Sequence, residues 1–277
     1  MRFTLSTHLL VYHELNEQAL AALAESPWSG LEIWLAEPHV RWRDLAAMAD
    51  LRQDLALHGL HAETVHLPLY PSVQRLIEMG ERWSLIDSDA TERATALEGM
   101  CAGVAAAAAL GAWGAVLHLG WPNDDWSHPT SGFAQQALET LLQCAREHDI
   151  VLLPENILSD GTSCTALAAL LDKLDPGRSA GICLDFGHAH LTDSVVAEAK
   201  RAGTRVKHLH LHDNDGESDA HLHPGQGTID FDEAFTHLGT SAFSGTAAWE
   251  IRDYSRGQKT PRELVQSVVQ SCSVWQA

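Results

Sequence analysis

The regular alternation of strand-like and helix-like segments constrains the fold of this chain more than any other feature. Eight short runs rich in apolar and β-branched residues alternate with eight amphipathic stretches over 277 residues. Eight such units match the (β/α)8 TIM barrel in number and in length, so we predict one α/β barrel domain spanning residues 1–277. The expected strands cover residues 2–7, 30–35, 61–67, 114–119, 150–155, 180–185, 205–212 and 246–251, and the expected helices cover residues 14–24, 42–58, 89–110, 132–148, 163–173, 194–202, 232–238 and 261–271.

An open, doubly wound sheet is the structural alternative. That fold binds its ligand at one switch point, and its dinucleotide-binding form opens the first helix with a G-x-G-x-x-G motif. The first expected helix here has no such motif, and polar residues stand at the ends of many strands. The barrel is therefore the favoured prediction.

Two connections are longer than a barrel requires. Residues 70–88 follow the third expected strand, and residues 120–131 follow the fourth. Both would rise over the C-terminal mouth of the barrel, where aromatic residues in loops often line a pocket. Trp121 is therefore a candidate substrate contact, whereas the Trp83 stretch could equally pack against a neighbouring subunit of a homo-oligomer.

Composition bears on the partners and the compartment. The chain carries 37 acidic and 18 basic residues, for a formal net charge of −19, which weighs against a nucleic-acid partner because such a surface repels phosphate backbones. The five cysteines are scattered, odd in number and without C-x-x-C spacing, which indicates a reducing compartment without disulfides. No signal-peptide core follows Met1, and the apolar run 102–110 is too short to span a bilayer, so we expect a cytoplasmic protein without membrane contact.

Polar side chains occupy the ends of the expected strands. Side chains alternate between inside and outside along a barrel strand, and catalytic groups in this fold lie at the C-terminal ends. If Leu152, Leu184 and Leu209 face the helices, the same alternation places a His, Asp or Glu inward on seven strands, with His188 on the turn after the fifth of them. These seven residues are Glu32, His66, His118, Glu155, Asp185, His210 and Glu250.

Each of these residues has an ordinary explanation by itself, since a strand-end His is usually a hydrogen-bonded packing residue and a strand-end carboxylate usually caps the next helix. Their convergence is harder to explain, because two carboxylates about 4 Å apart repel by roughly 4 kcal/mol at an effective dielectric near 20. Glu155, Asp185 and Glu250 would therefore take up protons or bind a cation. With His210 beside them, a divalent ion is the simpler interpretation, and this ligand set suits Mn²⁺, Mg²⁺, Co²⁺ or Zn²⁺, with about one ion per chain.

Histidines are concentrated in the segment 205–223. Three of them share one face of the expected strand, and an Asp and two more His follow in the loop: His208, His210, His212, Asp219, His221 and His223. A solvated polar face would explain the strand alone, but imidazoles and carboxylates at this density are suited to a divalent cation. The choice of His210 as the ligand stays open, because its two neighbours lie on the same face.

These motifs resemble those of the xylose-isomerase-like TIM barrels, which include sugar isomerases and epimerases and the DNA-repair enzyme endonuclease IV. The matching pieces occur in that family's order and span most of the chain. They are Thr64-Val-His66-Leu-Pro, Val116-Leu-His118, Leu153-Pro-Glu155-Asn156, Leu184-Asp185-Phe-Gly-His188, His210-Leu-His-Asp213-Asn-Asp-Gly216, the loop 219–230 with its Asp-x-His and Gly-x-Gly, and Trp249-Glu250.

The ketose 3-epimerase branch of that family implies a metal-dependent isomerase or epimerase acting on a sugar or a related polyhydroxy or keto compound. The resemblance implies a divalent ion held by Glu155, Asp185, His210 and Glu250, with His188 contacting the substrate. Both glutamates would also move protons through a metal-stabilised enediolate, so Glu155, Glu250 and His188 are the candidate catalytic residues. Epimerases usually carry an Arg shortly after the metal-binding His, where this chain reads Asp213-Asn-Asp-Gly216.

Further substrate contacts are expected from His66, Glu32, Trp121 and Arg252. Arg252 lies two residues beyond Glu250 and on the same side of the strand. Its guanidinium could meet a substrate carboxylate or phosphate, or it could be a solvated charge at the rim.

Endonuclease IV provides the alternative activity, a metal phosphodiesterase acting on abasic DNA. Residues resembling many of its zinc ligands are present, and those outside the four-residue set are candidates for a second metal or for substrate binding: His118, His188, Asp219 and His221. The first His of that enzyme's set falls within residues 69–75, where this chain has none, and the acidic balance opposes a DNA-binding groove. A third possibility is a barrel that binds a metal or sugar without turnover, against which the presence of both Glu155 and Glu250 argues.

Overall fold

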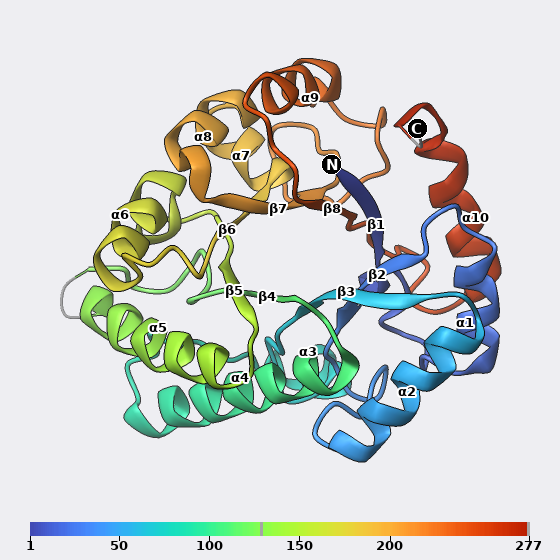
Figure 1. Ribbon diagram of the computed structural model, residues 1–277, viewed down its shortest axis with the longest axis horizontal. Helices are drawn as coiled ribbons and strands as arrows, with labels where there is room; N and C mark the ends of the chain where they lie inside the picture. The colour runs from blue at the N-terminus through green and yellow to red at the C-terminus, as the bar shows by residue number, and fades with distance from the viewer. Residues whose placement is uncertain (128–129, 276–277) are drawn as a thin grey trace.

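Eight parallel strands form a ring at the centre of the molecule in the computed structural model, which describes residues 1–127 and 130–275 (Figure 1). Their hydrogen-bonded order is β5-β4-β3-β2-β1-β8-β7-β6, so neighbours in sequence are neighbours in the ring. The predicted (β/α)8 barrel is therefore confirmed. The strands are β1 (Arg2–Ser6), β2 (Gly30–Trp34), β3 (His61–His66), β4 (Gly114–Leu117), β5 (Val151–Pro154), β6 (Ile182–Asp185), β7 (Val206–Leu211) and β8 (Thr246–Trp249).

The ring closes between β5 and β6 through a short contact at the strand tips. Glu155 forms an isolated bridge with Cys183 there. The side chain of Asn156 binds both backbone groups of Asp185, accepting from its N–H at 2.7 Å and donating to its carbonyl at 3.2 Å. One amide thus holds the two tips together and places Glu155 next to Asp185.

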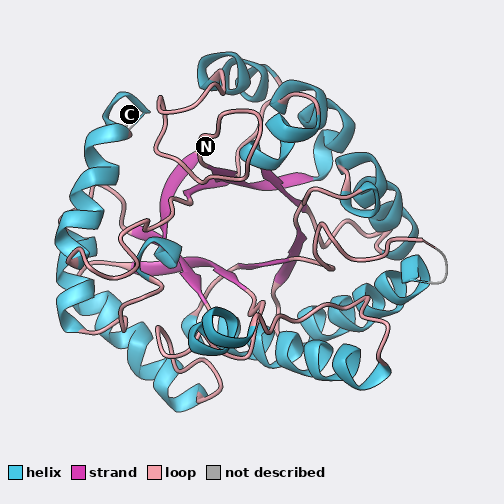
Figure 2. Cartoon of the chain, turned by 180° about the vertical axis from the view of Figure 1, so that it is seen from behind, coloured by secondary structure: helices cyan, strands magenta, loops and turns pink. Residues whose placement is uncertain are grey.

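The outer layer consists of helices that surround the strands on all sides (Figure 2). Two of them begin three residues later than predicted, because a side chain caps the first turn. Asn16 accepts from two backbone N–H groups at the start of α1, and Asp44 does the same for α2. The predicted helices are α1 (Glu17–Ala24), α2 (Leu45–Leu57), α4 (Ala90–Leu110), α5 (Thr130–Glu147), α6 (Cys164–Leu174), α8 (Val195–Ala202), α9 (Phe231–Thr240) and α10 (Pro261–Ser271).

Several short helices between the main elements or after them were not predicted. They are α3 (Val73–Met79) and α7 (Phe186–Thr192), together with the 3-10 helices η1 (Thr7–Leu10), η2 (Asp160–Thr162), η3 (Gly203–Arg205) and η4 (Ser273–Trp275). One or two turns are too few to show an apolar period in the sequence. Two of them nevertheless shape the mouth, because α3 covers one side of it and α7 starts from the tip of β6.

Strand residues pack alternately against the helices and into the barrel interior. Leu152, Leu184 and Leu209 are fully buried in the large cluster that joins the strands to the surrounding helices. Val116, Leu153 and Cys183 form a separate small cluster inside the ring. The alternation used to find the inward polar residues therefore holds.

The two long connections differ in their relation to the mouth. Trp83 is 7% exposed, packs edge-on against Trp42 and lies over Gly99, so little of its ring remains for a pocket or for another subunit. In the segment 120–131, Trp121 does face the mouth, while residues 128–129 lie outside the described part of the chain.

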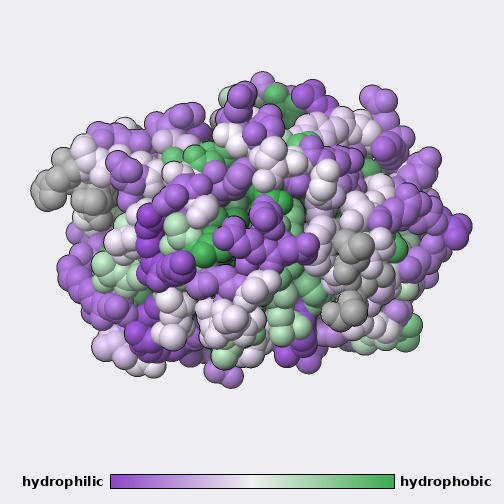
Figure 3. All heavy atoms as spheres, turned by 90° about the horizontal axis from the view of Figure 1, so that it is seen from above, coloured by the Kyte–Doolittle hydropathy of each residue, from purple (hydrophilic) through white to green (hydrophobic). Residues whose placement is uncertain are grey.

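The outer surface is mostly polar on the face that Figure 3 shows. Hydrophilic side chains cover most of the face shown in Figure 3, and hydrophobic ones occur in small separate areas. Within residues 1–127 and 130–275, no helix is both long enough and apolar enough to cross a bilayer. All five cysteines are free in the structure.

Candidate metal centre

Four residues that the sequence assigned to a metal meet at the C-terminal mouth of the barrel. Asp185 is the last residue of β6, His210 lies in β7, and Glu155 and Glu250 directly follow β5 and β8. All four are at most 2% exposed. One potential ligand atom from each lies within 4.8 Å of those from the other three.

His210 presents its Nδ1 atom to all three carboxylates. This nitrogen lies 3.3 Å from an oxygen of Glu155, 3.3 Å from one of Glu250 and 3.9 Å from one of Asp185. Within the described residues it makes no hydrogen bond, although it is buried. Buried polar atoms are almost always paired, so an unpartnered nitrogen facing three carboxylates fits the ligand set of a divalent ion.

The histidines two residues before and two residues after His210 have other partners. His212 places Nε2 3.1 Å from Asp185 Oδ2 and thereby holds that carboxylate. His208 lies deeper in the barrel, where it contacts Glu32 at 3.0 Å and Thr246 at 2.7 Å. Of the three, His210 is the one whose free nitrogen faces the carboxylate cluster.

Asp185 combines the capping role with a place in the cluster. Its Oδ1 accepts from the His188 backbone N–H at 2.6 Å and caps α7. Its Oδ2 faces His212 and His210. The ordinary explanation of a strand-end carboxylate is therefore correct here, and it does not exclude the site.

A second potential ligand group lies beside the first and contains His188, Asp219 and His221. Asp219 Oδ2 lies 3.5 Å from His188 Nε2 and 3.3 Å from His221 Nε2. Asp219 Oδ1 is buried and without a hydrogen bond in the described structure.

A third group contains His66, His118 and Glu155. Glu155 Oε2 lies 3.1 Å from His118 Nε2 and 3.5 Å from His66 Nε2. Because Glu155 belongs to both this group and the four-residue set, the two are contiguous. The sequence had suggested His66 only as a substrate contact.

The loop that carries Asp219 and His221 is organised by Asp213. This fully buried carboxylate accepts from four backbone N–H groups at 2.9 to 3.1 Å. Two of the donors belong to the Gly-x-Gly motif, Gly225 and Gly227. A Cβ atom at Gly227 would lie 2.4 Å from the Asp213 carboxylate, so only glycine allows this approach.

A cavity of about 400 Å³ opens onto the three groups. Its floor includes Glu155, His188, Asp219, His221 and Glu250. One wall is apolar and comes from η1, β2, the β3–α3 connection and α3, while the opposite rim carries Arg252 and Arg256.

The expected substrate contacts divide into two sets. Trp121, His118 and Arg252 line the cavity. Glu32 does not reach it, because its side chain is fully buried beneath His210. A direct substrate contact therefore does not fit the position of Glu32. His66 is also buried and lies behind His118 and Trp34.

The two glutamates of the cluster differ in their surroundings. Burial alone would raise the pKa of Glu155, but the imidazoles of His210 and His118 outweigh it and hold the pKa well below its usual value. Burial raises the pKa of Glu250 well above its usual value, and the charges of Glu155, Glu32 and Asp185 add to this. The carboxylates thus do not all ionise readily together without a cation.

Sequence reasoning missed His8, which lies in η1 and lines the cavity. Its ring packs 4.4 Å from Trp34 and 5.6 Å from His221, measured between centroids. Burial lowers its pKa well below the usual value, and His221 adds to the effect. The signal was available, because Thr4, Ser6 and His8 continue the inward alternation of β1 beyond its end.

A barrel with carboxylates and unpartnered imidazole atoms at its C-terminal mouth belongs to the class of TIM barrels with a ligand set for metal ions. The sequence model of the xylose isomerase-like TIM barrel family matches residues 20–271. The chain belongs to this family, as its motifs predicted.

Individual relatives are distant. Fructoselysine 3-epimerase of Shigella flexneri is 24% identical over 248 residues, covering 85% of this chain and 84% of that protein. The uncharacterized protein MJ1311 of Methanocaldococcus jannaschii is 27% identical over 166 residues, which is 55% of this chain and 56% of that protein. The crystal structure of IolI with a bound zinc atom has a TM-score of 0.76 at 17% identity, covering 99% of this chain and 97% of that one, which shows the same fold.

Proposed function

We propose that the protein is a divalent-metal-dependent isomerase or epimerase acting on a sugar or a related polyhydroxy or keto compound. The observation that carries this proposal is the buried His210 Nδ1, which faces three carboxylates and, among the described residues, has no hydrogen-bond partner. The fructoselysine 3-epimerase relative supports the class of activity. The zinc-containing IolI structure supports the class of cofactor.

Glu155, Asp185, His210 and Glu250 would hold the ion, which on these ligands can be Mn²⁺, Mg²⁺, Co²⁺ or Zn²⁺. Bound there, it would supply Lewis-acid polarisation of a substrate carbonyl and the adjacent hydroxyl. Its charge would also offset the repulsion among three carboxylates that the protein alone leaves only partly compensated.

The two glutamates of the cluster would transfer the proton. Glu155 and Glu250 line the cavity from the tips of β5 and β8, which stand three places apart in the ring of eight. One glutamate takes the proton from the carbon next to the carbonyl, and the other returns it to the same or the opposite face. His188 lies between Glu155 and Asp219 and contacts the substrate from the same floor.

The remaining walls favour a substrate with both polar and apolar parts. Trp121 and the apolar side contact the carbon skeleton, and its hydroxyl groups meet the imidazoles and carboxylates of the floor. Arg252 is exposed and lines the cavity, so its guanidinium can bind an acidic group of the substrate.

The proposal is tested by metal content and by exchange of a substrate carbon-bound proton. Purified protein should hold about one tightly bound divalent ion per chain, and a chelator should remove both the ion and the exchange activity. Glu250→Gln should lower exchange on a panel of ketoses and keto acids by about 100-fold or more, whereas Glu217→Gln at the exposed loop tip should leave it unchanged. A metal-free protein with full activity would overturn the mechanism.

A metal phosphodiesterase is the second candidate. The observation that favours it is that further potential ligand groups adjoin the first, among them His188, Asp219 and His221, and His66, His118 and the shared Glu155. This activity predicts up to three ions per chain and incision of a duplex containing an abasic site. A content near one ion and no incision would exclude it, and the net charge of −19 opposes binding of such a substrate.

A further inference from the structure

A buried carboxylate lies directly below the mouth, outside the four-residue set. Glu32 comes from β2 and is fully buried. Its two oxygens lie 3.0 and 3.2 Å from the Nε2 atom of His210, the nitrogen that points away from the cavity. A buried carboxylate requires compensation, so its position here needs a reason.

Three strands fix this carboxylate in place. Thr64 of β3 donates its hydroxyl to Glu32 Oε2 at 2.9 Å. His208 of β7 places Nε2 3.0 Å from the same oxygen, and its Nδ1 lies 2.7 Å from the hydroxyl of Thr246 in β8. The side chain therefore cannot turn toward the substrate without breaking all of these contacts.

The hydrogen bonds also determine which nitrogen of His210 carries a proton. A carboxylate only accepts, so each group bonded to Glu32 must donate. His210 therefore carries its proton on Nε2, which leaves the lone pair of the neutral ring on Nδ1. That atom is the one that faces Glu155, Asp185 and Glu250.

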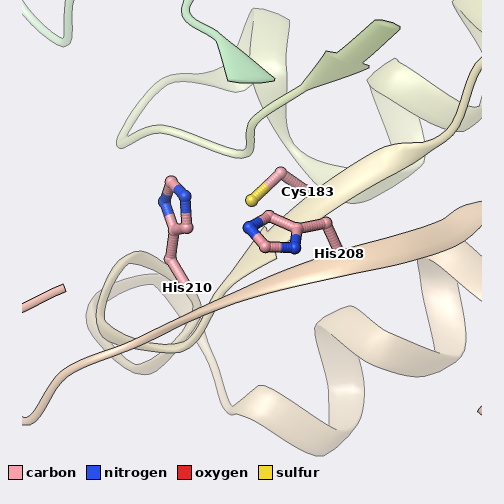
Figure 4. Close-up of side chains that lie close together, drawn as sticks. All are labelled: Cys183, His208 and His210. Carbon is pink, nitrogen blue, oxygen red and sulfur yellow. The ribbon is translucent and has the colours of Figure 1, made fainter. Parts of the chain in front are cut away.

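The same assignment of donors and acceptors explains a further cluster, formed by Cys183, His208 and His210 (Figure 4). The potential ligand atoms of these three residues lie within 4.8 Å of one another. Both ring nitrogens of His208 are occupied, by Glu32 and by Thr246. His208 thus has no lone pair left for an ion, and this group belongs to the support of His210.

We infer that Glu32 is a positioning residue that orients His210 and directs its Nδ1 atom to the ion, with His208 and Thr64 holding Glu32 in turn. The inference rests on the metal site proposed above. A carboxylate bonded to the second nitrogen of a metal-binding imidazole fixes the ring and increases its basicity as a ligand. Glu32 would act only through His210 and never touch the substrate.

The test compares Mn²⁺ affinity in protein stripped with a chelator, measured by calorimetry for the wild type and for Glu32→Gln. The amide keeps the volume of the side chain but offers only one accepting atom. We expect its affinity to fall by about 10- to 100-fold. The matched control is Glu63→Gln, a carboxylate of β3 that pairs with Arg2 at 3.2 Å, where affinity should stay within twofold.

A second readout separates positioning from general stability. In the metal-free state, at a pH where the His210 ring is neutral, nitrogen NMR should show the ring protonated on Nε2 in the wild type and a mixture of tautomers in Glu32→Gln. If that variant does not fold, Thr64→Val removes one donor while keeping the carboxylate, and a threefold or larger loss of affinity is expected.

The outcomes distinguish the two proposals. A wild type that binds no divalent ion overturns the proposed function and this inference together. A wild type that binds Mn²⁺, with folded Glu32→Gln binding it equally well, overturns the inference and leaves the metal site standing. Equal losses in Glu32→Gln and Glu63→Gln would also overturn it.

Discussion

The mouth of the barrel and the layer beneath it contain the same kinds of side chain but differ in how the imidazole nitrogens are bonded. At the mouth, Glu155, Asp185 and Glu250 surround an imidazole nitrogen that bonds to none of them. Below it, Glu32 accepts from a hydroxyl and two imidazoles. Oε2 of Glu32 takes all three of these hydrogen bonds, whereas His210 Nδ1 has none among the described residues. Because buried polar groups are normally paired, we call the lower layer the frame, and the nitrogen at the mouth marks where a group from solution completes the structure.

Asp213 belongs to the frame, and its loss should have the largest effect. Asp213→Ala would leave four buried backbone N–H groups without their acceptor. We expect the free energy of unfolding to fall by about 4 kcal/mol, measured by urea denaturation of metal-free protein. Asp215→Ala, at the exposed tip of the same loop, is the control and should change it far less. Equal effects would mean that Asp213 is not a support.

His39 provides a paired imidazole that does not line the cavity, and it makes the frame sensitive to acid. It lies 2.6 Å from the His13 carbonyl and 3.0 Å from the Thr7 hydroxyl, and burial lowers its pKa to about 4. Between pH 6.5 and 4 the unfolded chain binds this proton and the folded chain does not, so stability is lost as the pH falls through that window.

The expected loss from this one group is about 3 kcal/mol. It is measured as the difference between wild type and His39→Gln, each unfolded with urea at pH 7 and at pH 4. The two proteins should differ in their acid sensitivity by this amount, and identical pH dependence would contradict the assignment.

A divalent ion should stabilise the folded protein through the residues of the mouth and not through those of the frame. Mn²⁺ or Zn²⁺ at 100 times its dissociation constant should stabilise the wild type by about 2.7 kcal/mol, because it binds only the folded state. Glu250→Gln removes one ligand and should abolish most of this increase. Thermal unfolding with and without the ion measures it, and an equal increase in the variant would exclude Glu250 from the site.

Without metal, Glu250→Gln should have the smallest effect of these changes on the free energy of unfolding. It should raise this free energy rather than lower it. Burial and the neighbouring Glu155, Glu32 and Asp185 raise the pKa of Glu250, so its charge destabilises the folded state once the pH rises through that value. A neutral Gln should therefore stabilise metal-free protein by about 1 kcal/mol at alkaline pH. The gain should vanish below pH 4.5, where the carboxyl is neutral in both states. A loss of stability at alkaline pH would contradict the crowding argument.

The sequence predicts the barrel and the inward residues well, since both depend on local alternation. Asp185 and Glu155 follow directly from the period of two along their strands. The sequence does not predict how deep in the barrel an inward residue lies. Glu32 and His210 both stand at inward positions in the sequence, although Glu32 lies beneath His210. Depth depends on the tilt of the strands and on partners far away in the chain, such as His208 for Glu32.

Other features were missed because their local signal is short. His8 lies in a single turn of 3-10 helix, and α3 has seven residues. Trp83 was expected over the mouth or at a subunit contact because aromatic residues in long connections often lie there. In the structure it fills the space above Gly99, a contact between segments that no sequence pattern reveals.

In the 213–230 loop, the residues that determine the path of the backbone are different from those that face outward. Asp213 binds the N–H groups near both ends of the loop, whereas residues 215–218 project into solvent. Mutations at the projecting residues can accumulate with little effect on folding, while Asp219 and His221 keep their places beside the cavity. A barrel of this kind can therefore diverge in specificity during evolution at one edge of its pocket without rebuilding the centre.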